Sequence, residues 1–257
     1  MAKIRATPLL GTFVEITLDR NAPESLFPSV FSRMRALERI FNFHDPESEL
    51  SRLNRSAGEH AHRCSLEMLA LLRICIELYE ASGGLFDPAV RAGAVSHQRR
   101  SLADLILTGD RARISAGTVL NLNGVAKGYI VDRACEMLLE GGAASVLVNA
   151  GGDLRREGAG ETPIWVRNPS SPGELRNLGL LRSGSVATSA GYFFAEGAEL
   201  PYVDPRSGRS LTQIPSVTVA APHCVYADAL TKIVLLGGDH HAALDRFGAQ
   251  AFVQWAV

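Results

Sequence analysis

Hydrophobic side chains recur along this chain with two different periods. From Phe13 to Leu18, apolar and polar residues alternate, as they do in a β-strand with one buried face. Apolar residues recur at helical spacing from Phe27 to Phe43 and again from Leu66 to Ala81. These patterns predict a strand and two amphipathic helices, with a polar loop at 44–54 between the helices. Serine is a favoured first residue of a helix, so a short helix can begin at Ser48 in this loop.

The second half of the chain mixes the same two patterns. A helix is predicted over Lys127–Gly141, where a glycine pair ends it. A buried strand is predicted over Ser145–Ala150, breaking at Gly151-Gly152, and further strands at Ile164–Val166 and Ser216–Ala220. Helices and strands do not alternate in a steady βαβ repeat, which favours an α+β fold over a doubly wound sheet. No repeat or linker composition divides the chain, so we expect a single domain over residues 1–257.

The overall charge argues against two classes of partner. The formal net charge is −1, and no dense run of lysine and arginine occurs. We therefore expect neither nucleic acid nor an anionic membrane surface as a partner, and no transmembrane segment. The four cysteines lack a CxxC pair, which argues against a zinc site or disulfides, and three of them fall in apolar helical contexts where a reduced, buried thiol is usual. The N-terminus lacks the pattern of a signal peptide, so we expect a cytoplasmic protein, or a periplasmic one if a leader was removed.

One apolar segment carries an unexpected pair of charges. The stretch A-D-A-L-T-K-I-V-L-L-G-G at 227–238 places Asp228 and Lys232 four residues apart. On a helix these two side chains share a face and can contact each other. An exposed ion pair worth a few tenths of a kcal/mol is one interpretation. The apolar run Ile233–Leu236 offers no polar side, however, which favours a partly buried pair with a functional reason.

The first candidate for ligand chemistry is the loop L-N-L-N-G-V-A-K-G at 120–128, which leads into the predicted helix. Free N–H groups at a helix start, with Lys127 in the first turn, suit a phosphate or pyrophosphate. Asp132, five residues on, could meet a sugar hydroxyl or have no such role. A turn of this kind is weak evidence alone, because many helices begin in a similar way.

Three further segments read as short loops of small or polar residues. They are N-A-G-G-D at 149–153, A-T-S-A-G at 187–191 and V-D-P-R-S-G at 203–208. The first follows a predicted strand, where the backbone can approach a ligand closely. An ordinary strand exit or hairpin turn explains each of them nearly as well.

Eight motifs occur in one order along almost the whole chain. They are P-L-L-G-T at 8–12, H-D-P-E-S-E-L-S-R-L-N at 44–54, G-L-F-D-P-A-V at 84–90, G-V-A-K-G-Y-I-V-D at 124–132, V-N-A-G-G-D-L at 148–154, A-T-S at 187–189, V-D-P-R-S-G at 203–208 and A-D-A-L-T at 227–231. In this order they resemble the ApbE family of FAD:protein FMN transferases. One such motif carries little information, but eight in register are specific.

The resemblance implies an α+β protein with FAD in a cleft between two lobes. It assigns the pyrophosphate to Lys127 and to the N–H groups near Gly124 and Gly128, and it places the ring of His44 over the isoalloxazine. Further positions that match cleft-lining residues of the family are Thr12, Asp87, Asp132, Asn149, Gly151, Gly152, Thr188, Ser189 and Asp204.

The implied reaction joins FMN to another protein. A threonine or serine hydroxyl of the acceptor protein attacks the FAD pyrophosphate, AMP leaves, and FMN stays in a phosphoester link. In the family, magnesium (Mg²⁺) bridges the phosphates. The resemblance would place this ion at Asp228 and the Ala126 carbonyl.

This chain departs from the family pattern at three places. Relatives often end in A-D-A-L-A-T, whose Asp and Thr help to hold the metal; here Lys232 takes the threonine position, and Thr231 lies one residue early, about 100° around a helix. The loop reads N-L-N-G at 121–124 where D-L-G-G is common, and Pro201 stands where many relatives carry a histidine. We expect the Lys232 ammonium, beside Asp228, to be able to replace magnesium.

Three functions remain open from the sequence. The first is a flavin transferase with Asp228 and Lys232 as its catalytic residues. The second is an FAD pyrophosphatase that releases FMN and AMP, since water could use the same activated phosphate. The third is a non-catalytic FAD-binding protein. Products formed from FAD with and without an acceptor would separate the three.

Overall fold

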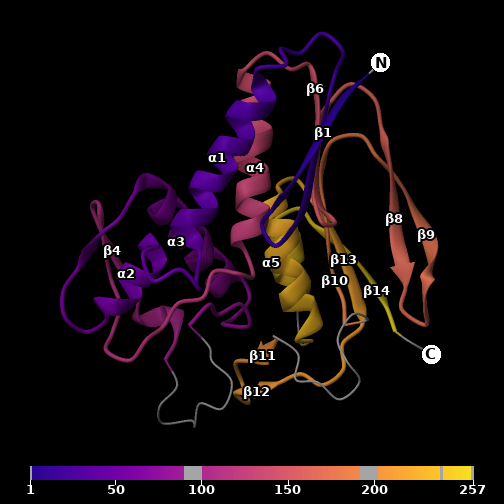
Figure 1. The fold of residues 1–257 in the computed structure, drawn as a ribbon. Coiled ribbons are helices and arrows are strands. Elements are labelled where there is room, and N and C mark those ends of the chain that lie inside the picture. Colours follow the sequence, from indigo (N-terminus) through magenta and orange to yellow (C-terminus); the bar gives the residue numbers. More distant parts are fainter. Residues whose placement is uncertain (1, 90–99, 192–201, 238–239, 256–257) are drawn as a thin grey trace.

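An antiparallel sheet of seven strands forms the centre of the structure (Figure 1). The computed structural model describes residues 2–89, 100–191, 202–237 and 240–255. The strand order is β1-β2-β6-β7-β10-β13-β14, and every neighbouring pair is antiparallel. The strands are β1 (Lys3–Leu9), β2 (Thr12–Leu18), β6 (Ser145–Ala150), β7 (Asp153–Gly158), β10 (Gly184–Ser189), β13 (Ser216–Ala221) and β14 (Gln250–Gln254).

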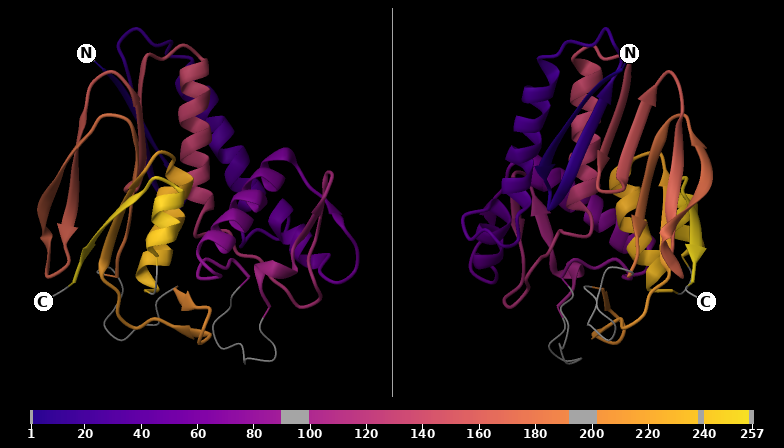
Figure 2. Two further views of the ribbon diagram at one scale, coloured as in Figure 1. Left: turned by 180° about the vertical axis from the view of Figure 1, so that it is seen from behind. Right: turned by 45° about the vertical axis from the view of Figure 1, so that its right-hand side comes forward.

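Three helices cover one face of this sheet, and a β-hairpin lies on the other side (Figures 1 and 2). The helices are α1 (Leu26–Phe41), α4 (Ala126–Glu140) and α5 (Cys224–Leu235). Helix α4 contacts β6 and β7, and α5 contacts β10 and β13. The hairpin consists of β8 (Thr162–Asn168) and β9 (Ser171–Leu181). Within the described ranges, no helix is long and apolar enough to cross a membrane.

The alternation of side chains gives the sheet two different faces. Val14 and Ile16 on β2 and Val148 on β6 are fully buried in the core shared with the helices. Glu15 and Asn149 lie between such residues and therefore point to the opposite face. The sequence thus builds an apolar face for the helices and a more polar face toward the hairpin.

A second lobe contains α2 (Glu49–Arg55), α3 (Leu66–Ala81) and a small sheet (Figure 1). Ser48 caps the start of α2, and its Oγ accepts a hydrogen bond from Ser51 N at 2.9 Å. Ser65 caps the start of α3 in the same way, because its Oγ accepts a hydrogen bond from Met68 N at 3.2 Å. These caps satisfy N–H groups that a helix start otherwise leaves without partners. The remaining elements are β3 (His62–Arg63), β4 (Ile106–Thr108), β5 (Arg111–Arg113), the 3-10 helix η2 (Leu102–Asp104), β11 (Val203–Asp204), β12 (Arg209–Ser210) and α6 (His241–Arg246).

Most elements that the sequence predicts are present, and the α+β class is confirmed. The helix predicted over Leu66–Ala81 has these bounds, and the others shift by at most a few residues. One prediction was wrong: the segment 187–191 is not a loop, because its first three residues complete β10. Small and hydroxyl-bearing residues gave no hydrophobic pattern there. They form a strand because they continue the pairing of β10 with β13, whereas β7 pairs only with residues 184–186.

All four cysteines are free and buried, including the three for which the sequence predicts a buried thiol. Burial raises the pKa of Cys64 to about 11 and that of Cys135 to about 12. These thiols therefore remain protonated at neutral pH, and they contribute packing rather than a thiolate nucleophile.

Helices α4 and α5 approach each other closely at Gly128. A Cβ placed on Gly128 would lie 2.4 Å from the Cys224 carbonyl oxygen and 2.8 Å from Val225 Cα. One turn further along α4, the Asp132 carboxylate accepts hydrogen bonds from Cys224 N and Val225 N, both at 2.8 Å. Arg155 on β7 donates to the same carboxylate at 2.8 Å. These contacts fix the start of α5 against α4.

We expect Gly128→Ala to lower the free energy of unfolding by about 1 to 3 kcal/mol, because the added methyl group meets backbone atoms that cannot rotate away. Denaturant unfolding measures the change. Gly173→Ala is the matched control, since a Cβ there has no heavy atom within 4 Å. Equal stability of the two variants would contradict the close approach of α4 and α5.

Candidate functional site

A cavity of about 780 Å³ lies between the polar face of the sheet, strand β8 and helix α5. It brings together residues from four of the eight sequence motifs, which are far apart in the chain. The predicted site residues that line it are Gly124, Lys127, Asn149, Gly151, Gly152, Thr188, Ser189, Asp228 and Lys232.

Four charged side chains form the most polar part of the cavity wall. Lys127, in the first turn of α4, pairs with Asp153 Oδ2 at 2.9 Å. Lys232 on α5 donates to Asp228 Oδ1 and, at 2.9 Å, to the Asp228 carbonyl oxygen. Gly128 N donates to Asp228 Oδ2 at 3.0 Å. The predicted contact between Asp228 and Lys232 on one helix face is confirmed.

The carboxylates are deeply buried, whereas the lysines reach the cavity. The side chains of Asp153 and Asp228 are 4% and 1% exposed, against 34% for Lys127 and 21% for Lys232. An anionic ligand in the cavity would therefore meet the ammonium groups before the acids. The pair of Asp228 and Lys232 is not the exposed surface pair that the sequence also allowed.

The charges shift one another's pKa values. Burial lowers the pKa of each lysine, but the neighbouring carboxylates outweigh this effect and raise the pKa of Lys127 and Lys232 above the ordinary value. Burial and the nearby Asp228 raise the pKa of Asp153 to about 6, against the lowering influence of the two lysines. Both ammonium groups therefore stay charged at neutral pH.

Hydroxyl groups and a glycine turn surround the charged residues. Ser189 Oγ lies 2.7 Å from Thr231 Oγ1, which itself donates to the Asp228 carbonyl oxygen at 2.7 Å. Asn149 Oδ1 accepts from Gly152 N at 2.9 Å and so holds the turn after β6. Both glycines of that turn have positive φ, with 63° at Gly151, a conformation that suits glycine.

Three predicted residues of α4 do not line the cavity. Asp132 points to the start of α5 and to Arg155, so its carboxylate serves the helix contact instead of a sugar hydroxyl. The Gly128 N–H is taken by Asp228, so it is not directed to a pyrophosphate in this structure. Ala126 begins the helix, and its N–H donates to the Leu122 carbonyl oxygen at 2.9 Å.

Four other predicted residues also lie outside the cavity lining. Asp87 Oδ1 accepts from Ala89 N and Leu102 N, at 2.9 and 3.0 Å, and so organises its own loop. Asp204 accepts from Arg206 N at 2.8 Å in the turn between β11 and β12. The two remaining residues are His44, whose ring packs edge-on against Phe43, and Thr12, whose side chain lies against Gly151. Pro201 lies outside the described residues.

The structure adds residues that the sequence reasoning did not select. Asp153 lines the cavity and pairs with Lys127, and its place directly after the glycine pair was a usable signal. Glu15, Trp165, Arg167 and Tyr202 also line it. The sequence predicts strand β8 and the turn at 203–208 from local patterns. Only the tertiary fold places them across from α5.

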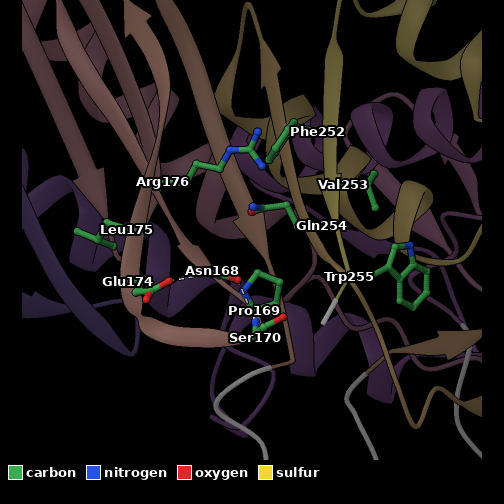
Figure 3. Close-up of a pocket in the computed structure, with 10 residues that line it drawn as sticks. All are labelled: Asn168, Pro169, Ser170, Glu174, Leu175, Arg176, Phe252, Val253, Gln254 and Trp255. Carbon is green, nitrogen blue, oxygen red and sulfur yellow. Dashed lines mark hydrogen bonds between the residues drawn. The ribbon is translucent and has the colours of Figure 1, made fainter. Parts of the chain in front are cut away.

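A second hollow, of about 560 Å³, lies beside the turn between β8 and β9 and strand β14 (Figure 3). The Arg176 guanidinium covers the Phe252 ring there, at 5.1 Å, while the exposed Trp255 lies near the end of β14. Its lining contains none of the residues that the sequence predicts for the site. The chemistry is therefore concentrated in the first cavity.

Comparisons with known proteins agree with the motif order. The sequence model of the ApbE family matches residues 10–249. A protein of Treponema pallidum named FAD:protein FMN transferase is 26% identical over 292 residues, which cover 94% of this chain and 81% of that protein. A protein of the same name from Klebsiella pneumoniae is 26% identical over 244 residues, covering 82% and 75%.

Solved structures show the same fold. The ApbE protein of Thermotoga maritima superposes with a TM-score of 0.85 at 23% identity, covering 98% of this chain and 94% of that one. The flavin transferase ApbE of Vibrio cholerae gives 0.83 at 19% identity, with the same coverage. A match of the family model to nearly the whole chain, in the fold of these structures, identifies this chain as a member of the ApbE family.

Proposed function

We propose that this protein is an FAD:protein FMN transferase, which moves FMN from FAD to a serine or threonine of an acceptor protein and releases AMP. The observation that carries the proposal is the pair of cavity ammonium groups, Lys127 and Lys232, in a chain of this family. Two fixed cations suit a ligand whose centre is a pyrophosphate. The names of the relatives support the same activity.

The reaction breaks the phosphoanhydride bond of FAD and forms a phosphoester bond to the acceptor. The acceptor hydroxyl oxygen bonds to the phosphorus on the FMN side, and the bridging P–O bond to AMP breaks. The bridging oxygen leaves with AMP and keeps the electron pair. The hydroxyl proton passes to a phosphate oxygen of the released AMP. Lys127 and Lys232 stabilise the negative charge that develops on the phosphate oxygens.

The cavity also offers surfaces for the flat rings of FAD. Among the residues that the structure describes, Trp165 on β8 and Tyr202 are the aromatic side chains that line it. Aromatic rings of this kind can stack on isoalloxazine or adenine. His44, which the family resemblance placed over the isoalloxazine, is outside the cavity lining, so we assign the stacking to Trp165 and Tyr202.

The residues around Asp228 do not fit a magnesium ion. Both carboxylate oxygens already accept hydrogen bonds, from Lys232 and Gly128 N, and Thr231 is turned toward Ser189. In the described part of the chain, no group of three or more His, Cys, Asp and Glu side chains could hold a metal ion. Magnesium prefers several oxygen ligands in octahedral geometry, which this set does not supply.

The proposed function is tested by mass spectrometry of a candidate acceptor protein after incubation with FAD and the purified enzyme. Transfer adds the mass of FMN, less one water, to a serine or threonine of the acceptor and releases AMP. AMP and free FMN without a modified acceptor would indicate a pyrophosphatase instead. Bound FAD that stays intact with an acceptor known to be flavinylated by a relative would indicate a binding protein without turnover.

We expect the protein to bind FAD at least tenfold more tightly than FMN, because the lysines contact a pyrophosphate and the cavity can also enclose the AMP half. Isothermal titration calorimetry with each flavin measures both dissociation constants. Equal constants would show that the AMP half and the second phosphate are not recognised.

Lys127→Ala should weaken FAD binding by about 1.5 to 3 kcal/mol, which is the loss of one charge-assisted phosphate contact. Lys3→Ala is the control, because Lys3 lies on β1 and donates to the Ala22 carbonyl oxygen instead of lining the cavity. A dissociation constant that changes equally little in both variants would remove Lys127 from the site.

A further inference from the structure

We propose that Lys232 is a built-in cation that replaces the divalent metal at Asp228, so that this protein binds the FAD pyrophosphate without magnesium. The inference rests on the proposed function and specifies how the same site is charged. The replacement affects FAD binding as well as FMN transfer, so measurements of either can test it.

Both oxygens of the Asp228 carboxylate are already occupied by hydrogen-bond donors. One oxygen accepts from the Lys232 ammonium and the other from Gly128 N at 3.0 Å. The ammonium is held a second time by the Asp228 carbonyl oxygen at 2.9 Å. The Lys232 ammonium therefore already lies at the buried Asp228 carboxylate. It occupies the oxygen that a metal ion would need as a ligand.

The neighbouring hydroxyl of Thr231 is turned away from the Asp228 carboxylate. Thr231 Oγ1 lies 2.7 Å from Ser189 Oγ and donates to the Asp228 carbonyl oxygen, so it does not join the carboxylate as a ligand. Any metal at Asp228 would instead lie beside an ammonium of the same charge sign. Repulsion and the missing oxygen both disfavour a divalent ion there.

The cation at Asp228 is a lysine whose head reaches the cavity. The chain has 26 lysines and arginines together, of which only Lys3, Lys127 and Lys232 are lysines. Two of these three line the cavity. An ammonium is a compact point charge and resembles a metal ion more than a planar guanidinium does. The Lys232 side chain is 21% exposed, so its head can contact a phosphate while it stays on Asp228.

The main test is an FAD titration of wild-type protein, after treatment with a chelator and after readdition of Mg²⁺. We expect the two dissociation constants to agree within twofold. Lys232→Met, which keeps the length and removes the charge, should weaken FAD binding at least tenfold in both conditions. Lys3→Met is the control and should bind like the wild type.

Lys232→Met leaves the buried Asp228 without its partner and for that reason could fail to fold. A second variant keeps the test valid in that case. Asp228→Asn together with Lys232→Met removes both charges, and it should fold yet bind FAD at least tenfold more weakly with or without Mg²⁺. Wild-type protein gives an independent readout, because reductive ¹³C-methylation labels only three lysines and the amino terminus. FAD should shift the Lys232 signal in NMR spectra, whereas Mg²⁺ alone should not.

The proposal is overturned if chelation weakens FAD binding of the wild type at least tenfold and Mg²⁺ restores it. It is also overturned if Mn²⁺ binds the wild type stoichiometrically in electron paramagnetic resonance titrations. Metal-independent FAD binding without transfer to any acceptor would support the role of Lys232 and refute the proposed transferase activity. Absence of FAD binding in every condition would refute both.

Discussion

The position of the charged cavity wall depends on one buried carboxylate, that of Asp132. It accepts hydrogen bonds from Cys224 N and Val225 N, which are among the N–H groups that a helix start leaves without intrahelical partners. A negative charge at this end also suits the helix dipole of α5. Arg155 pairs with the same carboxylate and is itself only 8% exposed. The start of α5 is thereby held by α4 and β7 together.

The rest of the site follows from this anchored start. With the first residues of α5 fixed and Gly128 allowing close approach, Asp228 comes within hydrogen-bond distance of Gly128 N. Lys232 lies one turn further along the same face and reaches back to Asp228. The α4 helix carries Lys127 in its first turn and so adds a second ammonium to the wall of the same cavity. The packing of α4 against α5 therefore determines the positions of the two partly exposed ammonium groups.

Sequence periodicity could predict the parts of this arrangement that depend on a single element. The alternation at Phe13–Leu18 and the shared face of Asp228 and Lys232 are local properties, and both hold in the structure. The role of Asp132 was misassigned because the motif placed it with Lys127, although five residues rotate a helix position by about 140°. The contribution of Trp165 was not predictable, since it depends on how the β8–β9 hairpin lies over the sheet.

A tethered ammonium and a bound divalent ion differ in what they demand from the protein. A metal needs several free oxygen ligands, whereas Lys232 needs one buried acid that holds its head and keeps it charged. Asp228 supplies this, because burial alone would lower the pKa of Lys232 and the carboxylate outweighs that effect. The acid in turn is held by Gly128 N, so its orientation does not depend on a ligand. On the proposal that Lys232 replaces the metal, Asp228 positions a cation instead of binding a metal ion, and both ammonium groups face the cavity before any ligand binds.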